Sequence, residues 1–547
     1  MKRYWIVLAV ILVLATAARF HGLAAKSLWL DEALSWRLQS FPIGTLIART
    51  GEPTTVHPPL YFVLLQQWVR LSGDSEFWLR APSAAAGALT VLAMFSFVYE
   101  LVRFWSGDRP TAARDAGLAG LLAAAMLAVN AFHVHLGHQV RGYTLGILLA
   151  VLTSQMLLRA LRLGSVRAWV AYACLALAFC YTHTLALFTL AAQGYFAGMY
   201  LLWSRSVKGA TVGIDPEIST RACEKGDRSN LPERPGGCGA QIGPVPFFTR
   251  WTGPVLAAAI IVAGYLPWLP NMFSQSEALR TSWTTGSRGV QDHVNEVNQA
   301  ILFTSATRAP DEPVLAWCVV GVLAGALTFG VVRTGWAGLY LACWACIPVF
   351  LLFAYSQFSQ RGIFSARYFA FAQPAWLAAL ACAVVWLPLR GERVILAGMF
   401  LLWTSFSYAE AYAVVGPAGN PGLRAAAAHI LEHRRDDELV VSASAFEFFK
   451  LAYYLRHTTP PLLCISQPGR ENQRGTAQLV DSDLATQEEI FQRQPQGLWI
   501  VTSNSYGVAE GRIVLPEGWE VVDQREYAQD FWMERPLQVR HCRLKPR

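Results

Sequence analysis

Trp336–Tyr355 reads WAGLYLACWACIPVFLLFAY, a run of 20 residues without a charged side chain. A helix of about 20 apolar residues matches the hydrocarbon thickness of a bilayer. The rest of the 547-residue chain has the same character, because 54% of its residues are hydrophobic and only 15% are charged. Soluble domains carry about 25% charge. We therefore predict a polytopic α-helical membrane protein and exclude a single soluble core.

Further apolar stretches bring the predicted number of transmembrane helices to about eleven. The first stretch is interpreted as a retained signal anchor, because no convincing cleavage site of small residues follows it. Besides Trp336–Tyr355, the predicted spans are Tyr4–Phe20, which is this first stretch, and Ala81–Val102, Ala116–Phe132, Tyr143–Leu161, Ala168–Cys180, Leu185–Trp203, Gly253–Trp268, Pro313–Val332, Tyr368–Leu389 and Val394–Ala411.

Lysine and arginine gather in alternate loops between these spans, which predicts the orientation of the chain. Under the positive-inside rule those loops face the cytoplasm, and so does the N-terminus. The remaining loops then face the periplasm of a bacterial inner membrane: residues 21–80, 133–142, 181–184, 270–312, 356–367 and everything after about 412. The net charge of +8 is explained by the cytoplasmic loops, so we predict membrane lipids and no nucleic acid as partners.

The chain divides into a membrane domain, residues 1–411, and a small periplasmic α/β domain, residues 412–547. In the second part, predicted helices at 423–433 and 446–456 alternate with predicted strands at 438–442 and 497–502. A polar stretch rich in proline and glycine, residues 206–246, predicts a disordered cytoplasmic insertion. Cys464 and Cys542 are the only cysteines of the α/β domain, so a disulfide between them is one option.

The first outer loop, residues 21–80, is predicted to contain short helices that lie along the membrane interface. Pro58-Pro59 suits the start of a helix, and Tyr61, Leu64, Leu65 and Trp68 follow at helical spacing. Residues 41–48 predict a second such piece. These helices would form a semi-rigid frame around the acidic pair Asp31-Glu32.

Asp31 and Glu32 are the best candidates for chemistry, although ordinary loop acidity is the alternative. Apolar neighbours on both sides favour a position against the membrane. Partial desolvation would raise the pKa of a carboxyl group there and make it a better general base.

Other polar residues lie in the outer loops, each with a structural alternative. His57 either lines a site or forms local hydrogen bonds. His133, His135 and His138 fit no strong metal signature. Arg141 could bind phosphate or only extend toward the interface. His183 could be structural, and Arg367 enters an apolar run and needs an anionic partner such as Asp31, Glu32 or a lipid phosphate.

The membrane region, about residues 1–410, resembles the bacterial GT-C membrane glycosyltransferases. It is most similar to the dolichyl-phosphate-mannose–protein mannosyltransferase-like branch (family 39-like), which includes aminoarabinose transferases of lipid A. The Asp-Glu pair and His-Pro-Pro-Leu-Tyr in one loop are the most specific of the shared motifs. The motifs are Arg19-Phe20, Trp29-Leu30-Asp31-Glu32, His57-Pro58-Pro59-Leu60-Tyr61, Leu79-Arg80-Ala81-Pro82-Ser83, Arg141-Gly142-Tyr143 and Arg367-Tyr368.

The resemblance implies a polyprenyl-phosphate sugar donor and Asp31 as the base, with Glu32 as an assisting residue or metal contact. A divalent metal would be held by Glu32 and His57. Many relatives have an acidic residue where this chain has Gln139, which weakens the metal assignment. The residues implied to bind the donor or its phosphate are His57, Tyr61, Arg80, Arg141, Tyr143, His183, Arg367 and Tyr368.

We therefore expect an inverting transfer of a sugar from the lipid donor to a periplasmic acceptor: a protein, a lipid or a glycan. A transporter or flippase of lipid-linked sugars is the main alternative. However, the polar candidates lie at the outer ends of spans, whereas transporters place them at mid-membrane. A ligase or polymerase of lipid-linked glycans would share the site and differ in the donor. A binding module on a membrane anchor is disfavoured by the number of spans.

Overall fold

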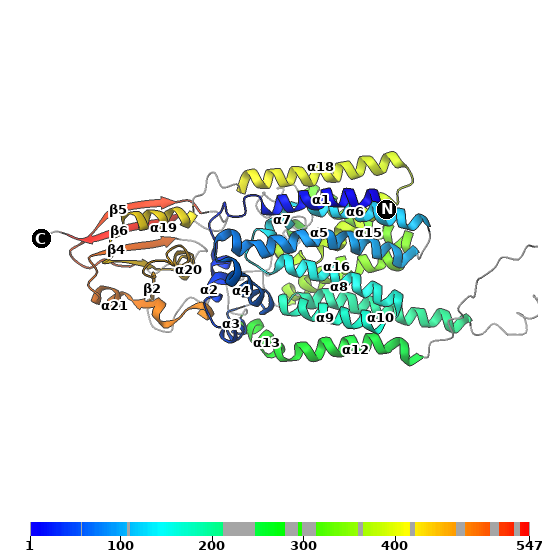
Figure 1. Cartoon of the computed structure of the whole chain (residues 1–547), viewed down its shortest axis with the longest axis horizontal. Helices are drawn as coiled ribbons and strands as arrows, with labels where there is room; N and C mark the ends of the chain where they lie inside the picture. Colours follow the sequence, from blue (N-terminus) through cyan, green and yellow to red (C-terminus); the bar gives the residue numbers. More distant parts are fainter. Residues whose placement is uncertain are drawn as a thin grey trace, which may run out of the picture.

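A bundle of long helices and a small sheet domain form the two ends of the protein, with three short helices between them (Figure 1). The computed structural model describes residues 2–55, 57–106, 110–211, 247–278, 294–297, 313–358, 365–415, 422–465, 476–503, 513–529 and 536–545. Most of the predicted insertion, residues 212–246, and most of the predicted outer loop 270–312 lie outside these described ranges.

Every predicted span overlaps a helix of the bundle, although the bounds differ by several residues. The helices are α1 (Lys2–Phe20), α5 (Glu76–Ser106), α6 (Pro110–Ala128), α8 (Tyr143–Leu163), α9 (Val166–Thr182), α10 (Ala186–Thr211), α12 (Phe247–Tyr265), α15 (Pro313–Thr334), α16 (Trp336–Phe358), α17 (Gln373–Val385) and α18 (Arg390–Val415). Among the described residues, five helices are long and apolar enough to cross a membrane, or six if one bent pair counts as a single span. The polytopic architecture is therefore confirmed, while the count of eleven spans stays a prediction.

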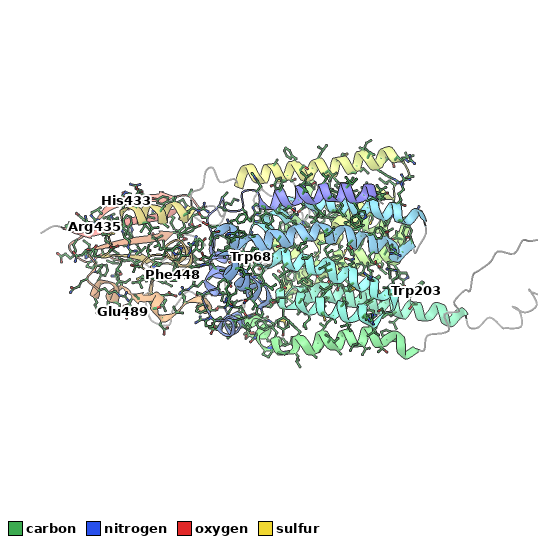
Figure 2. The ribbon with its side chains drawn as sticks, viewed as in Figure 1. Trp68, Trp203, His433, Arg435, Phe448 and Glu489 are labelled. Carbon is green, nitrogen blue, oxygen red and sulfur yellow. The ribbon has the colours of Figure 1, made fainter. Side chains whose placement is uncertain are left out.

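Large apolar side chains cover the outside of the bundle. Trp5, Val13, Leu402 and Phe406 are between 59% and 72% exposed, as suits side chains that face lipid rather than water. Figure 2 shows Trp68 where the short helices meet the bundle, and Trp203 near the opposite end of the bundle. Tryptophans at both ends are typical of the two membrane–water interfaces.

The bent pair consists of α6 and α7 (Ala131–Gly137), whose axes differ by 61°. The side chain of Asn130 accepts a hydrogen bond from the backbone N–H of His133 and so caps α7. The fully buried Arg19 donates to the carbonyls of Leu127 and Ala128, each at 3.0 Å, at the end of α6. A cation suits a helix C-terminus, where carbonyls lack intrahelical partners. These contacts stabilise the bend that leads the chain to Arg141.

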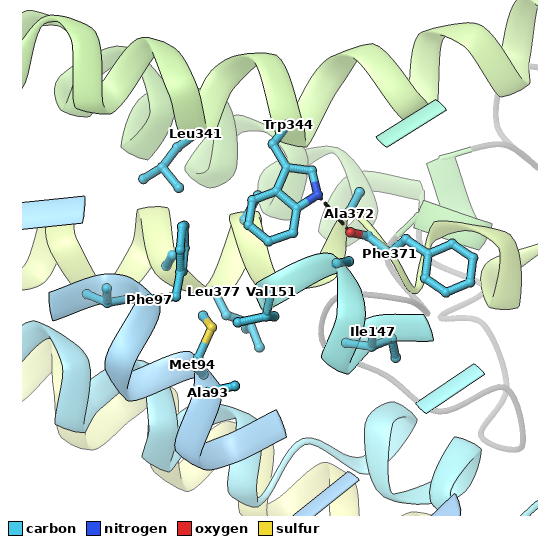
Figure 3. Close-up of a cluster of buried hydrophobic side chains, with 14 of the residues drawn as sticks. Ala93, Met94, Phe97, Ile147, Val151, Leu341, Trp344, Phe371, Ala372 and Leu377 are labelled. Atoms are coloured by element: carbon cyan, nitrogen blue, oxygen red, sulfur yellow. Dashed lines mark hydrogen bonds between the residues drawn. The ribbon is translucent and has the colours of Figure 1, made fainter. Parts of the chain in front are cut away.

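The buried core of the bundle fixes the segment that follows Arg367. The indole Nε1 of Trp344 donates a 2.9 Å hydrogen bond to the carbonyl of Phe371 (Figure 3). Trp344 is fully buried and packs edge-on against Phe97, with ring centroids 5.3 Å apart. The backbone at Phe371 is therefore anchored to the packed interior, a few residues from a candidate site residue.

Three short helices form the first outer loop: α2 (Leu30–Leu38), α3 (Ile43–Thr50) and α4 (Leu60–Ser72). The predicted helix after Pro59 is α4, and the predicted second piece at 41–48 corresponds to α3. Tyr61 and Leu65 are buried as predicted, whereas Leu64 is 49% exposed. Phe62, on the adjacent position, takes part in the core instead.

The sheet domain contains α19 (Gly422–His433), β1 (Glu438–Ser442), α20 (Ala445–Tyr454), β2 (Leu462–Ile465), β3 (Leu484–Thr486), α21 (Gln487–Gln492), β4 (Gly497–Ser503), β5 (Trp519–Tyr527) and β6 (Leu537–Leu544). Its strand order is β3-β2-β1-β4-β6-β5, with β3, β2, β1 and β4 parallel and β6 antiparallel to both of its neighbours. The predicted helices and strands all occur. The optional disulfide is wrong: Cys464 on β2 and Cys542 on β6 are free cysteines on strands separated by β1 and β4.

Candidate active site

Asp31 lies between two arginines that come from distant parts of the chain. Its Oδ2 is 3.0 Å from Nη2 of Arg141, in the connection between α7 and α8. The same oxygen is 3.6 Å from Nη1 of Arg367, on the 3-10 turn η2 (Ala366–Phe369). The Asp31 side chain is 21% exposed, so it is accessible. Two guanidinium groups and one carboxylate leave a surplus of one positive charge among these three residues, which suits an anionic ligand.

Glu32 has a different environment, although it is the next residue. Its two oxygens accept hydrogen bonds from Nε and Nη2 of Arg80 at 2.8 and 2.6 Å. They also accept from the backbone N–H groups of Val140 and Trp29 at 3.1 and 3.3 Å. Glu32 is 1% exposed. This side chain therefore ties α2 to α5 and to the segment before Arg141.

Arg80 is also fully engaged. Besides Glu32, it donates to the carbonyls of Leu23, Lys26 and Ser27 at 2.9 to 3.1 Å. These carbonyls belong to the turn between α1 and α2, and Arg80 itself is 3% exposed. The predicted role of Arg80 in binding donor phosphate therefore has little support from its contacts, which fix the loop.

Four aromatic rings, those of His57, Tyr143, His183 and Phe371, pack together and form a wall near Arg141 and Arg367. The rings of His57 and His183 are 5.0 Å apart, and Tyr143 lies 6.2 Å from His57 and 5.4 Å from His183. Phe371 packs against His183 at 4.9 Å. Arg367 lies 5.4 Å from the ring of Tyr368, its neighbour in the chain. The predicted residues His57, Tyr143, His183, Arg367 and Tyr368 thus form one group of neighbouring side chains, which Arg367 links to Asp31.

The two histidines of this wall are uncharged near neutral pH. Burial, together with Arg141 and Arg367, lowers the pKa of His183 to about 3. Burial and the charges of Arg141, His183 and Arg367 hold the pKa of His57 well below its usual range. Burial disfavours the charged form of imidazole, and a nearby cation disfavours it further.

The tautomer of His183 follows from its hydrogen bonds. Its Nδ1 accepts a hydrogen bond from the backbone N–H of Leu185 at 3.2 Å. A neutral imidazole carries one proton, so the proton is on Nε2. That Nε2 is buried and has no hydrogen-bond partner among the described residues. A buried donor without a partner is costly, by about 1–3 kcal/mol, and points to a ligand as the missing acceptor.

Tyr61 supports the backbone of the segment that carries Arg141. Its hydroxyl lies 2.9 Å from Oγ of Ser83, and Ser83 donates to the carbonyl of Arg141 at 3.0 Å. A Cβ at Gly142 would lie 3.2 Å from Cβ of Tyr61, so glycine lets α4 approach closely. Tyr61 is therefore brought to the site, but as a support behind Arg141.

No metal site forms from the predicted residues. Within the described ranges, no group of three or more histidine, cysteine, aspartate or glutamate side chains is placed to hold a metal ion. The predicted contact Glu32 is saturated by Arg80 and backbone N–H groups. His135 is paired with Gln139 at 2.9 Å, and His133 with Arg19 at 2.9 Å. The prediction of a metal held by Glu32 and His57 therefore finds no fit here.

Two contributors to the site were not predicted from the sequence. Phe371 was part of an apolar run, and its only signal was its position four residues after Arg367. Ser83 is the last residue of the shared motif Leu79-Arg80-Ala81-Pro82-Ser83, but no role was predicted for it. Both act through packing or backbone contacts that no local pattern reveals.

Comparisons with known proteins support the fold. No protein-family model and no curated protein matches the sequence. Among solved structures, ArnT from Cupriavidus metallidurans in the apo state is 14% identical, with a TM-score of 0.56 over 98% of this chain and 97% of ArnT. ArnT bound to undecaprenyl phosphate gives 14% identity and a TM-score of 0.53 over 98% of each chain.

An Archaeoglobus fulgidus oligosaccharyltransferase is 13% identical over 92% of this chain and 69% of its own, with a TM-score of 0.47. The likeness to ArnT extends over nearly the whole length of both chains. It shows that this chain has the ArnT fold, so the predicted GT-C-like fold is confirmed.

Proposed function

We propose that this chain is a membrane glycosyltransferase that moves a sugar from a polyprenyl-phosphate donor to an acceptor, with inversion at the anomeric carbon. The observation that carries the proposal is the position of Asp31 between Arg141 and Arg367. A carboxylate that can take a proton thus lies beside two cations that can bind phosphate. The ArnT fold supports it, since ArnT has been solved with undecaprenyl phosphate bound.

Arg141 and Arg367 bind the donor phosphate. A polyprenyl-phosphate sugar is a phosphodiester with one negative charge, which matches the surplus of one positive charge among Asp31, Arg141 and Arg367. Guanidinium groups suit phosphate because their planar N–H donors match its oxygens. When the arginines turn toward the phosphate, their hold on Asp31 weakens, and the carboxylate becomes a stronger base.

Asp31 then removes the proton from the acceptor group as that group attacks the anomeric carbon. The new bond forms at this carbon while its bond to the phosphate oxygen breaks, so the configuration inverts. The proton stays on Asp31, and the electron pair leaves with the polyprenyl phosphate. The two arginines now face a monoester with up to two negative charges, and stabilise the charge as it develops.

The neutral wall orients the donor. His183 offers Nε2–H to an oxygen of the phosphate or the sugar without adding charge, and this supplies the partner that it lacks. In this proposal His57, Tyr143 and Tyr368 also contact the donor. Glu32, Arg80 and Tyr61 do not contact the donor in this proposal; they position the backbone around Asp31 and Arg141.

The reaction is assigned to the outer face of the bacterial inner membrane, with the sheet domain in the periplasm and the N-terminus in the cytoplasm. The lysines and arginines gather in alternate loops, which supports this orientation under the positive-inside rule. In this assignment residues 1–411 form the transferase domain and 412–547 the periplasmic domain. A protein, lipid or glycan in the periplasm is the acceptor.

The direct test incubates the purified protein in detergent with defined undecaprenyl-phosphate sugars and measures released undecaprenyl phosphate. We expect release with at least one donor when an acceptor extract is present. Absence of release with every donor, combined with movement of the intact donor across a vesicle membrane, would favour a flippase instead. Release from a donor that carries a whole glycan would favour a ligase.

A further inference from the structure

The helix α2 presents Asp31 to the arginines and a different side to the sheet domain. Leu30, Ala33, Leu34 and Arg37 recur at i, i+3, i+4 and i+7, which places them along one side of a helix. Leu30 and Ala33 are 4% and 0% exposed. They belong to one apolar cluster with side chains of α20: Ala445, Phe446, Phe448, Phe449 and Ala452.

Polar contacts reinforce this interface at the two ends of α2. Just before the helix, the N–H of Leu28 donates to the hydroxyl of Tyr454 at 2.8 Å. In its last turn, Nη2 of Arg37 lies 2.8 Å from Oδ2 of Asp483, in the 3-10 turn η4 (Asp481–Asp483). The Arg37 and Asp483 side chains are 19% and 8% exposed. Both ends of the helix are therefore attached to the sheet domain.

Further ion pairs join the same two parts of the chain. Arg424 of α19 lies 2.9 Å from Glu76, and Arg456, after α20, lies 3.0 Å from Asp74. Tyr453 of α20 donates its hydroxyl to the carbonyl of Asp74 at 3.0 Å. The sheet domain is thus attached near the beginning and the end of the first loop, in keeping with the position of the short helices between the two ends of the protein (Figure 1).

A helix as short as α2 depends on such contacts. It has nine residues, and isolated helices shorter than about 12–15 residues are marginal in water. Its acidic pair lies in the first turn, so a shift of the helix moves Asp31 relative to Arg141. A displacement of about 1 Å at a catalytic group can lower a rate by about 100-fold.

We propose that the sheet domain is a component of the active site, in which α20, Tyr454 and Asp483 position the base Asp31 through α2. This inference rests on the proposed function. In this proposal the named residues are positioning residues, which act on Asp31 through the placement of α2. Their removal is expected to lower the turnover rate while leaving the affinity for undecaprenyl phosphate unchanged, because the two arginines do not depend on α20.

The test is a double-mutant cycle with Arg37→Gln, Asp483→Asn and the double variant in the full-length protein. Each single change should lower kcat about 5- to 10-fold, and the double change should lower it no further, because both remove one shared interaction. Undecaprenyl phosphate binding should stay within about 2-fold, since the pair lies outside the phosphate site. Arg525→Gln is the matched control: Arg525 pairs with Asp523 at 3.2 Å on β5 of the same domain and should leave kcat unchanged.

A second, milder variant distinguishes displacement of α2 from a general loss of folding. Tyr454→Phe keeps the ring and removes only the hydroxyl that accepts from Leu28, with Tyr527→Phe on β5 as its control. Hydrogen exchange of residues 30–38 should become faster in Tyr454→Phe and stay unchanged in Tyr527→Phe. Exchange needs no substrate, so it tests the positioning even if the wild type releases no undecaprenyl phosphate.

Two results would overturn the inference. One is full kcat in Arg37→Gln, Asp483→Asn and Tyr454→Phe. The other is equal loss of kcat and undecaprenyl phosphate binding in all three, which would mean general damage to the protein rather than displacement of Asp31. Failure of the proposed function alone looks different: the wild type would be inactive, while exchange at α2 would still respond to Tyr454→Phe.

Discussion

Arg80 contacts both carboxylate oxygens of Glu32, with Nε and Nη2 at 2.8 and 2.6 Å. Asp31, the adjacent residue, is instead partly exposed and shared between Arg141 and Arg367. The two neighbouring carboxylates thus have different surroundings: Glu32 is buried in an ion pair, whereas Asp31 is partly exposed beside two arginines. The difference leads to opposite expectations for their variants.

Asp31→Asn should remove most turnover and leave donor binding intact. The amide keeps the shape of the side chain but is not a base, and a general base contributes about 10²–10⁴-fold to a rate. Release of undecaprenyl phosphate measures the first effect, and binding of undecaprenyl phosphate measures the second. Asp436→Asn, in the exposed turn before β1, is the control. Normal turnover in Asp31→Asn would refute the assignment of the base.

Glu32→Gln should lower stability more than Asp31→Asn does. Removing one partner of a buried ion pair leaves Arg80 uncompensated, which costs about 3–5 kcal/mol. The apparent melting temperature in detergent is the measurement. A melting temperature equal to that of the wild type would show that Glu32 does not support the fold.

Arg367→Lys should weaken donor binding. Lysine keeps the charge but not the planar N–H donors, and we expect an affinity for undecaprenyl phosphate about 10-fold lower, or about 1.4 kcal/mol. Binding can be followed by competition with a labelled lipid phosphate. Arg333→Lys, in the last turn of α15, should have no effect, since it lies on an exposed helix end. Equal affinities for both variants would argue against a phosphate contact at Arg367.

His183 should make the folded protein less stable as the pH falls. The unfolded chain takes up a proton at this histidine near pH 6.5, but the folded protein does so only at about 3. Between these values the unfolded state binds more protons, so stability declines with falling pH, by at most about 1.4 kcal/mol per pH unit for this group. Melting temperatures from pH 7.5 to 5 should fall less steeply in His183→Gln.

His183→Gln also separates the role of His183 as a hydrogen-bond donor from its protonation. Glutamine supplies an N–H near the position of Nε2, so His183→Gln should retain more turnover than His183→Ala. Between pH 5 and 8 the turnover of the wild type should show no inflection from His183, because the imidazole stays neutral there. An inflection that disappears in His183→Gln would mean that this histidine titrates during the reaction.

The sequence predicted the parts of the fold that have a local signal. Long apolar runs located the bundle helices, and Glu438–Ser442 was predicted as a strand with the bounds that β1 has. In contrast, β5 reads WEVVDQREY and carries charges at four of its nine positions, which is typical of an exposed surface rather than a strand. It is a strand because it pairs with β6 at the edge of the sheet.

The candidate site was predicted as a set of residue types but not as an arrangement. Motifs brought Asp31, Arg141 and Arg367 to attention, and the prediction that Arg367 needs an anionic partner fits its contact with Asp31. Which carboxylate each arginine meets depends on how α2, α5 and the chain before α8 pack together. Arg80 was therefore expected at the donor phosphate, although its contacts are with Glu32 and loop carbonyls.

Arg37 and Asp483 are separated by 446 positions in the chain, so the ribosome makes them at different times. The helix that carries Asp31 is made near the beginning, whereas its supporting partners are made near the end. Because domains generally fold as they are completed, the bundle would exist for a time without the sheet-domain contacts of α2. A newly made chain should therefore remain inactive until its last strands have folded, which would keep an immature transferase from consuming lipid donor.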